Sequence, residues 1–220
     1  MTYREAIAHW GIYAITDREM AGGRTHAEIG AELIEGGVRV IQLRDKTTPF
    51  EQLLEDTREM VEIARPHNVP IIVNDNPYLA RDGDADGVHL GQNDCPVEIA
   101  RDIIGPDRLL GLSTHTPLQA LAAQLKDVDY IGLGPIFATT TKRQSYRPLG
   151  LKMVRWAAAT LRVPFVAIGG ITAETIADVF AAGARHCAMV SALMKSDDIT
   201  ARARHFVRLR EQLLQEDDVE

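Results

Sequence analysis

Two aspartates follow short apolar segments of this chain at equivalent points. Asp75 comes shortly after the apolar run 70–73, and Asp94 comes shortly after the run 85–90. Runs this short and this apolar are typical of strands that are buried on both faces of a parallel sheet. The carboxyl ends of such strands form the edge of the sheet where α/β proteins bind ligands. Two carboxylates that converge there would suit Mg²⁺ shared with substrate phosphates.

The same two aspartates could instead be helix caps or turn formers. Pro77 and Pro96 follow them, and proline fits the first turn of a helix. Aspartate is a common residue just before such a turn. Considered alone, the two segments favour a metal site and caps equally, so the other polar residues of the chain must decide.

Amide and cationic side chains follow the expected second strand. Gln42, Arg44 and Lys46 occupy alternate positions of an extended segment, so we expect their side chains to point the same way. Arg44 can bind an anion through its planar fork, and Lys46 can add a point charge. The alternative is a solvated strand end with scattered charge.

A long polar loop follows the expected sixth strand. Its hydroxyl and ammonium groups belong to Thr139, Thr140, Thr141 and Lys142. The segment 135–150 is long for a connection in a barrel, which favours a functional loop that closes over phosphates. The alternative is an ordinary polar surface loop.

Two adjacent glycines end the expected seventh strand. Barrels commonly bind a monophosphate at the ends of the seventh and eighth strands, through backbone N–H groups at a helix start. In this chain those strand ends carry Gly169, Gly170 and Ser191. A tight turn that requires glycine is the alternative, and we favour the phosphate site.

Two histidines of the chain are interpreted separately. We expect His89 to be a core residue inside a strand, and we leave the role of His115 open.

Segments typical of strands and of helices alternate from end to end. Strands are expected to begin near residues 11, 38, 70, 85, 109, 129, 164 and 187. Thr25, Thr48 and Thr172 are expected to cap helices between them. Eight strands with intervening helices predict an α/β fold, a (β/α)₈ TIM barrel. An open doubly wound sheet fits less well, because it would rarely need eight strands and the Gly-x-Gly-x-x-Gly turn is missing after the first one.

Composition limits the domain organisation and the partners. We expect one barrel domain over residues 1–220, with a short lead-in at 1–10 and a frayed acidic tail at 215–220. A net charge of −7 argues against a general basic surface for nucleic acid, so any anion site must be local. Cys95 and Cys187 lack metal-ligand spacing and fit a reducing cytoplasm. No signal peptide and no membrane span is expected, and a homo-oligomer is compatible with the sequence.

Six motifs of the chain together resemble the thiamine-phosphate synthase family. They occupy segments 13–17, 42–46, 73–75, 87–94, 134–142 and 167–171, in the order that the family has. Each motif alone is modest, whereas the set is highly specific. One departure lies at 143–147, where the family often has an acid and this chain is basic and aromatic.

The resemblance implies a transferase that forms a C–N bond. It would join 4-amino-2-methyl-5-hydroxymethylpyrimidine diphosphate to 4-methyl-5-hydroxyethylthiazole phosphate, giving thiamine phosphate and pyrophosphate. The matched positions imply that the diphosphate is bound by Gln42, Arg44, Lys46, Asn74 and Lys142, and Mg²⁺ by Asp75 and Asp94. They imply that Ser113 faces the reacting groups, and that the thiazole phosphate is bound by Thr139, Thr141, Gly170, Val190 and Ser191. The expected catalytic residues are Arg44, Ser113 and Lys142.

Two rival functions are alternatives to this synthase. A thiazole-ring isomerase (a tautomerase) of the same superfamily would not need the whole set of cations and metal acids. A non-catalytic ligand-binding regulator would lose the metal acids and would add a partner or DNA surface, which the acidic composition disfavours. We therefore expect an enzyme whose substrates are small molecules and whose pyrophosphate leaves before the thiazole nitrogen adds.

Overall fold

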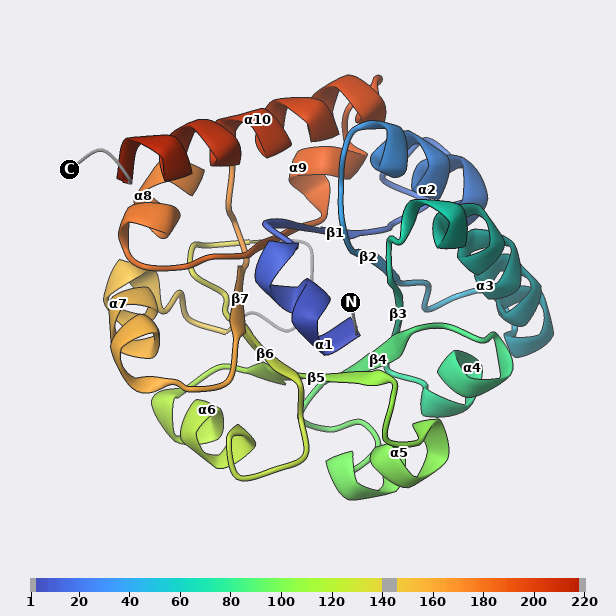
Figure 1. The fold of residues 1–220 in the computed structure, drawn as a ribbon. Coiled ribbons are helices and arrows are strands. Elements are labelled where there is room, and N and C mark those ends of the chain that lie inside the picture. Colours follow the sequence, from blue (N-terminus) through green and yellow to red (C-terminus); the bar gives the residue numbers. More distant parts are fainter. Residues whose placement is uncertain (1–2, 140–145, 218–220) are drawn as a thin grey trace.

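A closed parallel barrel forms the centre of the molecule, as seen in a computed structural model that describes residues 3–139 and 146–217. Each strand pairs with the next along the chain, and β8 pairs with β1 (Figure 1). The strands of the described chain are β1 Ile12–Ile15, β2 Ile41–Leu43, β3 Ile71–Asn74, β4 Gly87–Leu90, β5 Leu109–Thr114, β6 Tyr130–Leu133, β7 Phe165–Ile168 and β8 Cys187–Met189. The predicted (β/α)₈ barrel is thereby confirmed.

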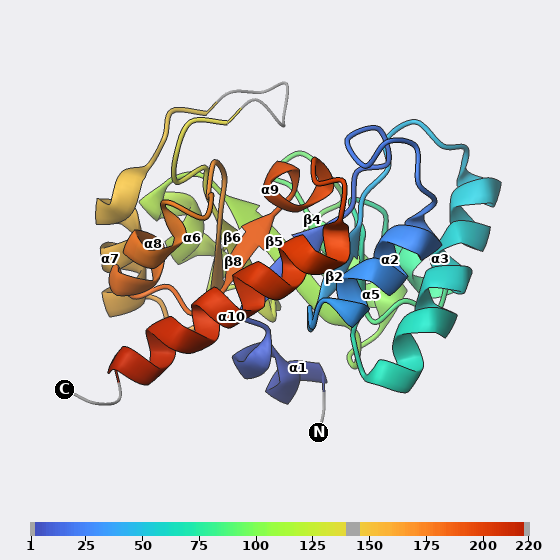
Figure 2. The ribbon, with the colours of Figure 1, turned by 90° about the horizontal axis from the view of Figure 1, so that it is seen from above.

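Helices surround this barrel as an outer ring (Figure 1). They are α2 His26–Glu35, α3 Phe50–Ala64, α4 Pro77–Asp82, α5 Val97–Ile104, α6 Pro117–Ala123, α7 Gly150–Thr160, α8 Ile176–Ala181 and α10 Ile199–Asp217, with a 3₁₀ turn, η2, at Arg65–His67. The short helix α9, Ser191–Met194, lies instead at the end of the barrel where the strands finish (Figure 2). Because each strand is covered by helices outside and by other strands inside, nearly all strand residues are buried. No helix among the described residues is long and apolar enough to cross a membrane.

The amino-terminal segment closes one end of the barrel. Helix α1, Tyr3–Ala6, and the 3₁₀ turn η1, Ile7–His9, lie across the end where the strands begin, opposite α9 (Figure 2). Trp10 follows them and packs edge-on against Tyr13 and Tyr130, with ring centroids 5.5 and 5.0 Å away. Ligands must therefore enter from the other end, where the strands finish.

One of the three expected threonine caps is confirmed. Thr25 Oγ1 accepts a hydrogen bond from Glu28 N at 3.1 Å, and Glu28 Oε2 accepts one from Thr25 N at 2.8 Å, which is a complete capping box. The cap expected at Thr48 is wrong, because α3 starts from Pro49 and the Thr48 hydroxyl bonds to Asp45 instead.

The cap expected at Thr172 is also wrong. Helix α8 begins at Ile176, and Thr175 occupies its N-cap position. Thr172 instead donates its backbone N–H to Thr175 Oγ1 at 2.9 Å. Ser191, expected as the end of the eighth strand, is the first residue of α9, because β8 already ends at Met189.

Candidate active site

Two acids lie together at the carboxyl ends of neighbouring strands. The carboxyl groups of Asp75, after β3, and Asp94, after β4, are within hydrogen-bonding reach of each other. Asp75 has a left-handed backbone, with φ of 66°, and its N–H donates to His89 O at 2.8 Å. Asp94 Oδ2 accepts from Gly91 N at 2.6 Å, and Asp75 Oδ2 lies 3.1 Å from Lys46 Nζ. Parallel pairing of β3 with β4 is what brings the two acids together.

Neither acid caps a helix. The N-cap of α4 is Asn76, whose Oδ1 accepts from the backbone of Tyr78 and Leu79 at 3.0 and 3.1 Å. Helix α5 has Pro96 at its N-cap and no side-chain cap. The helix-cap alternative is therefore wrong, although Asp94 does close a turn through its bond to Gly91.

Crowding of the two carboxyl groups has an electrostatic consequence. Partial burial, together with the nearby carboxyl of Asp75, raises the pKa of Asp94, and the Gly91 N–H and Lys46 act in the opposite direction. A cation placed between the two groups would relieve their repulsion. No set of three His, Cys, Asp or Glu side chains that could hold a metal occurs in the described ranges. A hard cation would therefore depend on substrate oxygens and water to complete its coordination.

Side chains of segment 42–46 face two adjoining cavities. Gln42 and Arg44 line a cavity inside the barrel, which we call the central cavity. Lys46 lines a second one beside Asp75 and Asp94, which we call the acid cavity, and Asn74 borders both.

Hydrogen bonds hold the turn after β2 in place. Asp45 accepts bonds from the backbone N–H groups of Thr47 and Thr48 at 2.8 and 3.0 Å, and from both hydroxyls. Burial alone would raise the pKa of Asp45, but these bonds hold it well below its usual range. On its other side Asp45 faces His26 at 3.4 Å. The turn that carries Arg44 and Lys46 is therefore fixed before any ligand binds.

A chain of polar side chains crosses the barrel interior. Gln42 Nε2 donates to Tyr13 Oη at 3.0 Å, and Tyr13 Oη bonds to Tyr130 Oη at 2.9 Å. His89 continues the chain with Nδ1 at 3.1 Å from Tyr130 Oη and Nε2 at 2.9 Å from Ser113 Oγ. Burial raises the pKa of both tyrosines, so both phenols stay neutral. The chain links Gln42 to Ser113 and orients both toward the central cavity.

Assignment of His89 to the core was incomplete. Its ring lies inside the barrel, but it also borders the central and acid cavities and bonds to Ser113. Sequence reasoning missed Tyr13 and Tyr130 as well. The available signal was a polar or aromatic residue at an inward position of a strand that is otherwise apolar.

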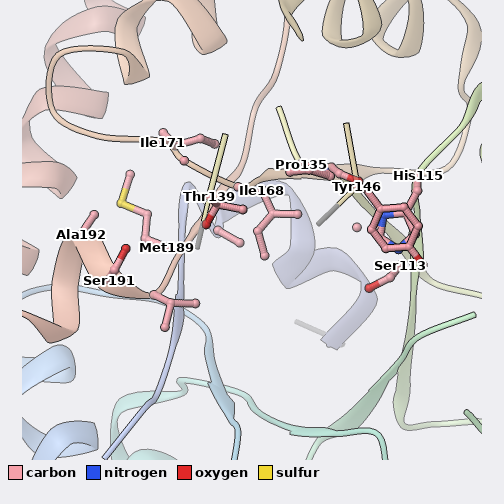
Figure 3. Close-up of a pocket in the computed structure, with 16 residues that line it drawn as sticks. Ser113, His115, Pro135, Thr139, Tyr146, Ile168, Ile171, Met189, Ser191 and Ala192 are labelled. Carbon is pink, nitrogen blue, oxygen red and sulfur yellow. The ribbon is translucent and has the colours of Figure 1, made fainter. Parts of the chain in front are cut away.

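A third cavity, here called the apolar cavity, opens over β6 to β8 and has a volume of about 750 Å³ including its open mouth. Figure 3 shows Ser113, His115 and Tyr146 on one side of it, Ser191 and Ala192 on the other, and Thr139 between them. Gly170 and Val190 also line it. Ser113 borders all three cavities, because its hydroxyl lies where β5 ends.

Gly170 is required by the packing of its turn. Its φ is +64°, and an added Cβ would lie 2.5 Å from Ala138 O and 2.8 Å from Phe137 Cβ. The tight-turn explanation of this glycine therefore holds, and the helix expected directly after it starts later, at Ile176. Ser191, at the first residue of α9, presents a helix start to the same cavity.

Two expected site residues lie outside the described residues. These are Thr141 and Lys142, and Thr140 lies there too. Thr139 and Tyr146, on either side of that segment, both line the apolar cavity.

Comparison with known proteins places this geometry in a family. A family model described as thiamine monophosphate synthase matches residues 12–193. The thiamine-phosphate synthase of Pelotomaculum thermopropionicum is 45% identical over 193 residues, covering 88% of each chain. That of Chloroflexus aurantiacus is 45% identical over 202 residues, covering 90% of this chain and 93% of its own.

The chain belongs to the thiamine monophosphate synthase family.

A solved structure agrees with this assignment. The thiamine phosphate pyrophosphorylase of Pyrococcus furiosus superposes with a TM-score of 0.87 at 31% identity, covering 94% of this chain and 98% of that one. The expected resemblance to thiamine-phosphate synthases is confirmed. Nothing in the site or in these relatives favours the isomerase or the regulator.

An aromatic pair lies at the segment 143–147, which departs from the expected family pattern. The rings of Tyr146 and His115 are stacked, with centroids 3.8 Å apart and planes 13° apart. Sequence reasoning noted the aromatic residue but gave it no role. Its partner lies 31 positions earlier on another strand end, so spacing alone could not pair them.

Proposed function

We propose that this protein joins 4-amino-2-methyl-5-hydroxymethylpyrimidine diphosphate to 4-methyl-5-hydroxyethylthiazole phosphate, giving thiamine phosphate and pyrophosphate. The observation that carries the proposal is the meeting of three cavities at Ser113. One cavity is acidic and cationic, one is lined by hydrogen-bonding groups inside the barrel, and one is mostly apolar. A diphosphate, a flat polar ring and a second ring with a phosphate are the three groups that these cavities would receive. Membership of the family supports the same reaction.

We assign Mg²⁺ to Asp75 and Asp94. Their donor set fits this ion, because two crowded carboxylates favour a hard cation and leave most of its coordination positions to phosphate oxygens and water. When bound, Mg²⁺ supplies positive charge that stabilises the departing pyrophosphate.

We assign diphosphate binding to the side chains around the acid cavity. Lys46 and Asn74 line it, and Arg44 lies at the neighbouring strand end with its backbone N–H held by Thr16 Oγ1 at 3.1 Å. We add Lys142 to this set from its place in the motif that the family shares. Gln42 was expected in the diphosphate group. Because it is 3% exposed and bonds to Tyr13 inside the barrel, we assign it to the pyrimidine ring instead.

The proposed reaction requires stabilisation of the charge on the leaving pyrophosphate more than it requires a general base. The C–O bond to the diphosphate breaks and its electron pair leaves with pyrophosphate, while the aminopyrimidine stabilises the resulting cation. The lone pair of the thiazole nitrogen then forms the C–N bond. Arg44 and Lys142 neutralise the charge that develops on the leaving group. Ser113, held by His89, faces the carbon at which both bonds change.

Thiazole phosphate is assigned to the apolar cavity. Thr139 offers a hydroxyl there, and the motif adds that of Thr141. Backbone N–H groups of Gly170, Val190 and Ser191 would complete the set, which is supported by the place of all three residues in the lining of this cavity. A monophosphate can be held by hydroxyl and N–H dipoles, whereas a diphosphate that must depart needs full charges.

We also propose one domain for residues 1–220 and a cytoplasmic location. Both cysteines of the described chain, Cys95 and Cys187, are free thiols, as suits a reducing compartment. The barrel is closed by its own amino-terminal segment, which supports a single unit.

Turnover with both substrates tests the proposed function. Purified protein, Mg²⁺ and the two substrates should yield thiamine phosphate and pyrophosphate in equal amounts, and chelation of the metal should stop both. Asp75→Asn is the matched variant for the metal site, because it removes one of the two acids while asparagine tolerates the left-handed backbone at this position. Wild-type protein that forms no thiamine phosphate, or a rate that is the same with chelator, would contradict the assignment.

A further inference from the structure

The ring of Tyr146 rests on a platform that the barrel holds rigidly. His115 Nδ1 lies 2.6 Å from Gly134 O, and since a carbonyl only accepts, this nitrogen carries the hydrogen. The backbone N–H of His115 donates to Gln119 Oε1 at 2.7 Å. The imidazole ring is thus held by the residue after β6 and its backbone by α6, and the Tyr146 ring stacks on the imidazole with centroids 3.8 Å apart.

This stacked pair lies where two substrate cavities meet. Ser113, His115 and Tyr146 line both the acid cavity and the apolar cavity. In the close-up the three side chains stand together at one side of the apolar cavity (Figure 3). Tyr146 is 39% exposed, so part of its side chain meets solvent while part lines the two cavities.

We infer that Tyr146, supported by His115, excludes water from the carbon that loses pyrophosphate. This inference rests on the proposed function, and it gives that site a specificity-determining residue. After the C–O bond breaks, two nucleophiles compete for the cation. The thiazole nitrogen gives thiamine phosphate. A water oxygen forms a C–O bond, loses a proton and gives the pyrimidine alcohol.

Covering this junction with aromatic rings favours the first outcome. An aromatic face offers water no strong hydrogen-bond partner, and a closed junction prevents hydrolysis of a reactive intermediate. The stack needs the tyrosine ring rather than its hydroxyl, because the contact to His115 is face to face. Phenylalanine at this position should therefore keep the function, and alanine should lose it.

Product partition in ¹⁸O-labelled water tests the inference. At saturating thiazole phosphate, the ratio of labelled pyrimidine alcohol to thiamine phosphate is measured for wild type, Tyr146→Phe and Tyr146→Ala. An alcohol whose hydroxyl oxygen is ¹⁸O reports water capture of the cation. A contaminating phosphatase would break the P–O bond instead and leave the original, unlabelled oxygen on the carbon. Tyr78→Ala is the matched control, since this tyrosine is 51% exposed on α4, away from the cavities.

We expect Tyr146→Ala to raise the ratio about tenfold, the factor that corresponds to losing one aromatic stack. Tyr146→Phe and Tyr78→Ala should stay within about twofold of wild type. His115→Asn keeps a donor toward Gly134 and removes the platform, so it should raise the ratio as well, which protects the test if Tyr146→Ala does not fold.

If folded Tyr146→Ala formed both products more slowly but in an unchanged ratio, the inference would be overturned and Tyr146 would have a structural role only. An increase in Tyr146→Phe equal to that in Tyr146→Ala would also overturn it, because the hydroxyl would then be the active group. Wild-type protein that forms neither product is a different failure, and it would contradict the proposed function itself.

Discussion

Replacing Asp94 by asparagine should abolish most activity and, without metal, stabilise the fold. The carboxyl of Asp94 is crowded against that of Asp75 at the barrel mouth. An asparagine side chain at this position would have nearly the same shape, and its oxygen could still accept from Gly91 N, as Asp94 does at 2.6 Å. The substitution therefore removes one charge and little else.

The substitution should change stability and activity in opposite directions. Removing one of two repelling, half-exposed charges should gain about 0.5–1 kcal/mol, which for a chain of this size raises Tm by about 2–4 °C. Burial and Asp75 raise the pKa of Asp94, so its ionisation weakens the metal-free fold as pH rises through that pKa. The gain should thus be present at neutral pH and vanish in acid, where Asp94 is protonated. Activity should fall by at least about 10²-fold, as for one lost charge-stabilising group.

Thermal unfolding and turnover together provide the assay. Wild type and Asp94→Asn are unfolded in chelator, and again with Mg²⁺ and pyrophosphate. The variant should be more stable in chelator, whereas the ligands should raise the Tm of wild type more. A variant that is less stable in chelator, gains as much from Mg²⁺ and pyrophosphate, or turns over like wild type would refute the reasoning.

Three further substitutions probe other residues of the barrel. In Gly91→Ala the new Cβ would lie 2.9 Å from Asp94 Oδ2, so the Mg²⁺ concentration for half-maximal rate should rise about tenfold; an unchanged metal dependence would contradict the ligand role. Burial lowers the pKa of His186 to about 4, so stability should fall by about 2 kcal/mol between pH 7 and 5. His186→Asn, which can still accept from Gly11 N, should flatten that dependence in urea unfolding, and a wild-type slope would exclude His186 as its cause. Lys142→Ala should slow pyrophosphate departure in single-turnover assays more than it weakens binding; a pure rise in KM would argue against its catalytic role.

Local patterns in the sequence were sufficient to predict the barrel and the meeting of its two acids. Strands that follow one another in a parallel barrel are neighbours, so residues just after β3 and β4 must share one region of the mouth. The partners His89 and Asn74 of the β3–β4 register show how directly this follows. The same argument placed Gln42 and Arg44 at the ligand face.

Contacts across the barrel could not be predicted in this way. Tyr13 and Tyr130 are separated by 117 positions, and their bond depends on both side chains turning inward at the same depth. The start of α8 was misplaced because residues 172–175 form a turn of their own before the helix, in which Thr172 N–H donates to Thr175 Oγ1. The stack of Tyr146 on His115 arises from a loop end whose position no periodicity fixes.

Separate binding of the two substrates tests most directly that one barrel mouth holds two distinct anion sites. Calorimetry with Mg²⁺ should compare Asp75→Asn, in the acid cavity, with Thr139→Val, which removes one hydroxyl from the apolar cavity at constant shape. We predict that Asp75→Asn weakens pyrimidine diphosphate about tenfold or more and that Thr139→Val weakens thiazole phosphate by about tenfold. Each variant should bind the other substrate within a few fold of wild type. Equal losses of both affinities in either folded variant would contradict the division of the mouth into two sites.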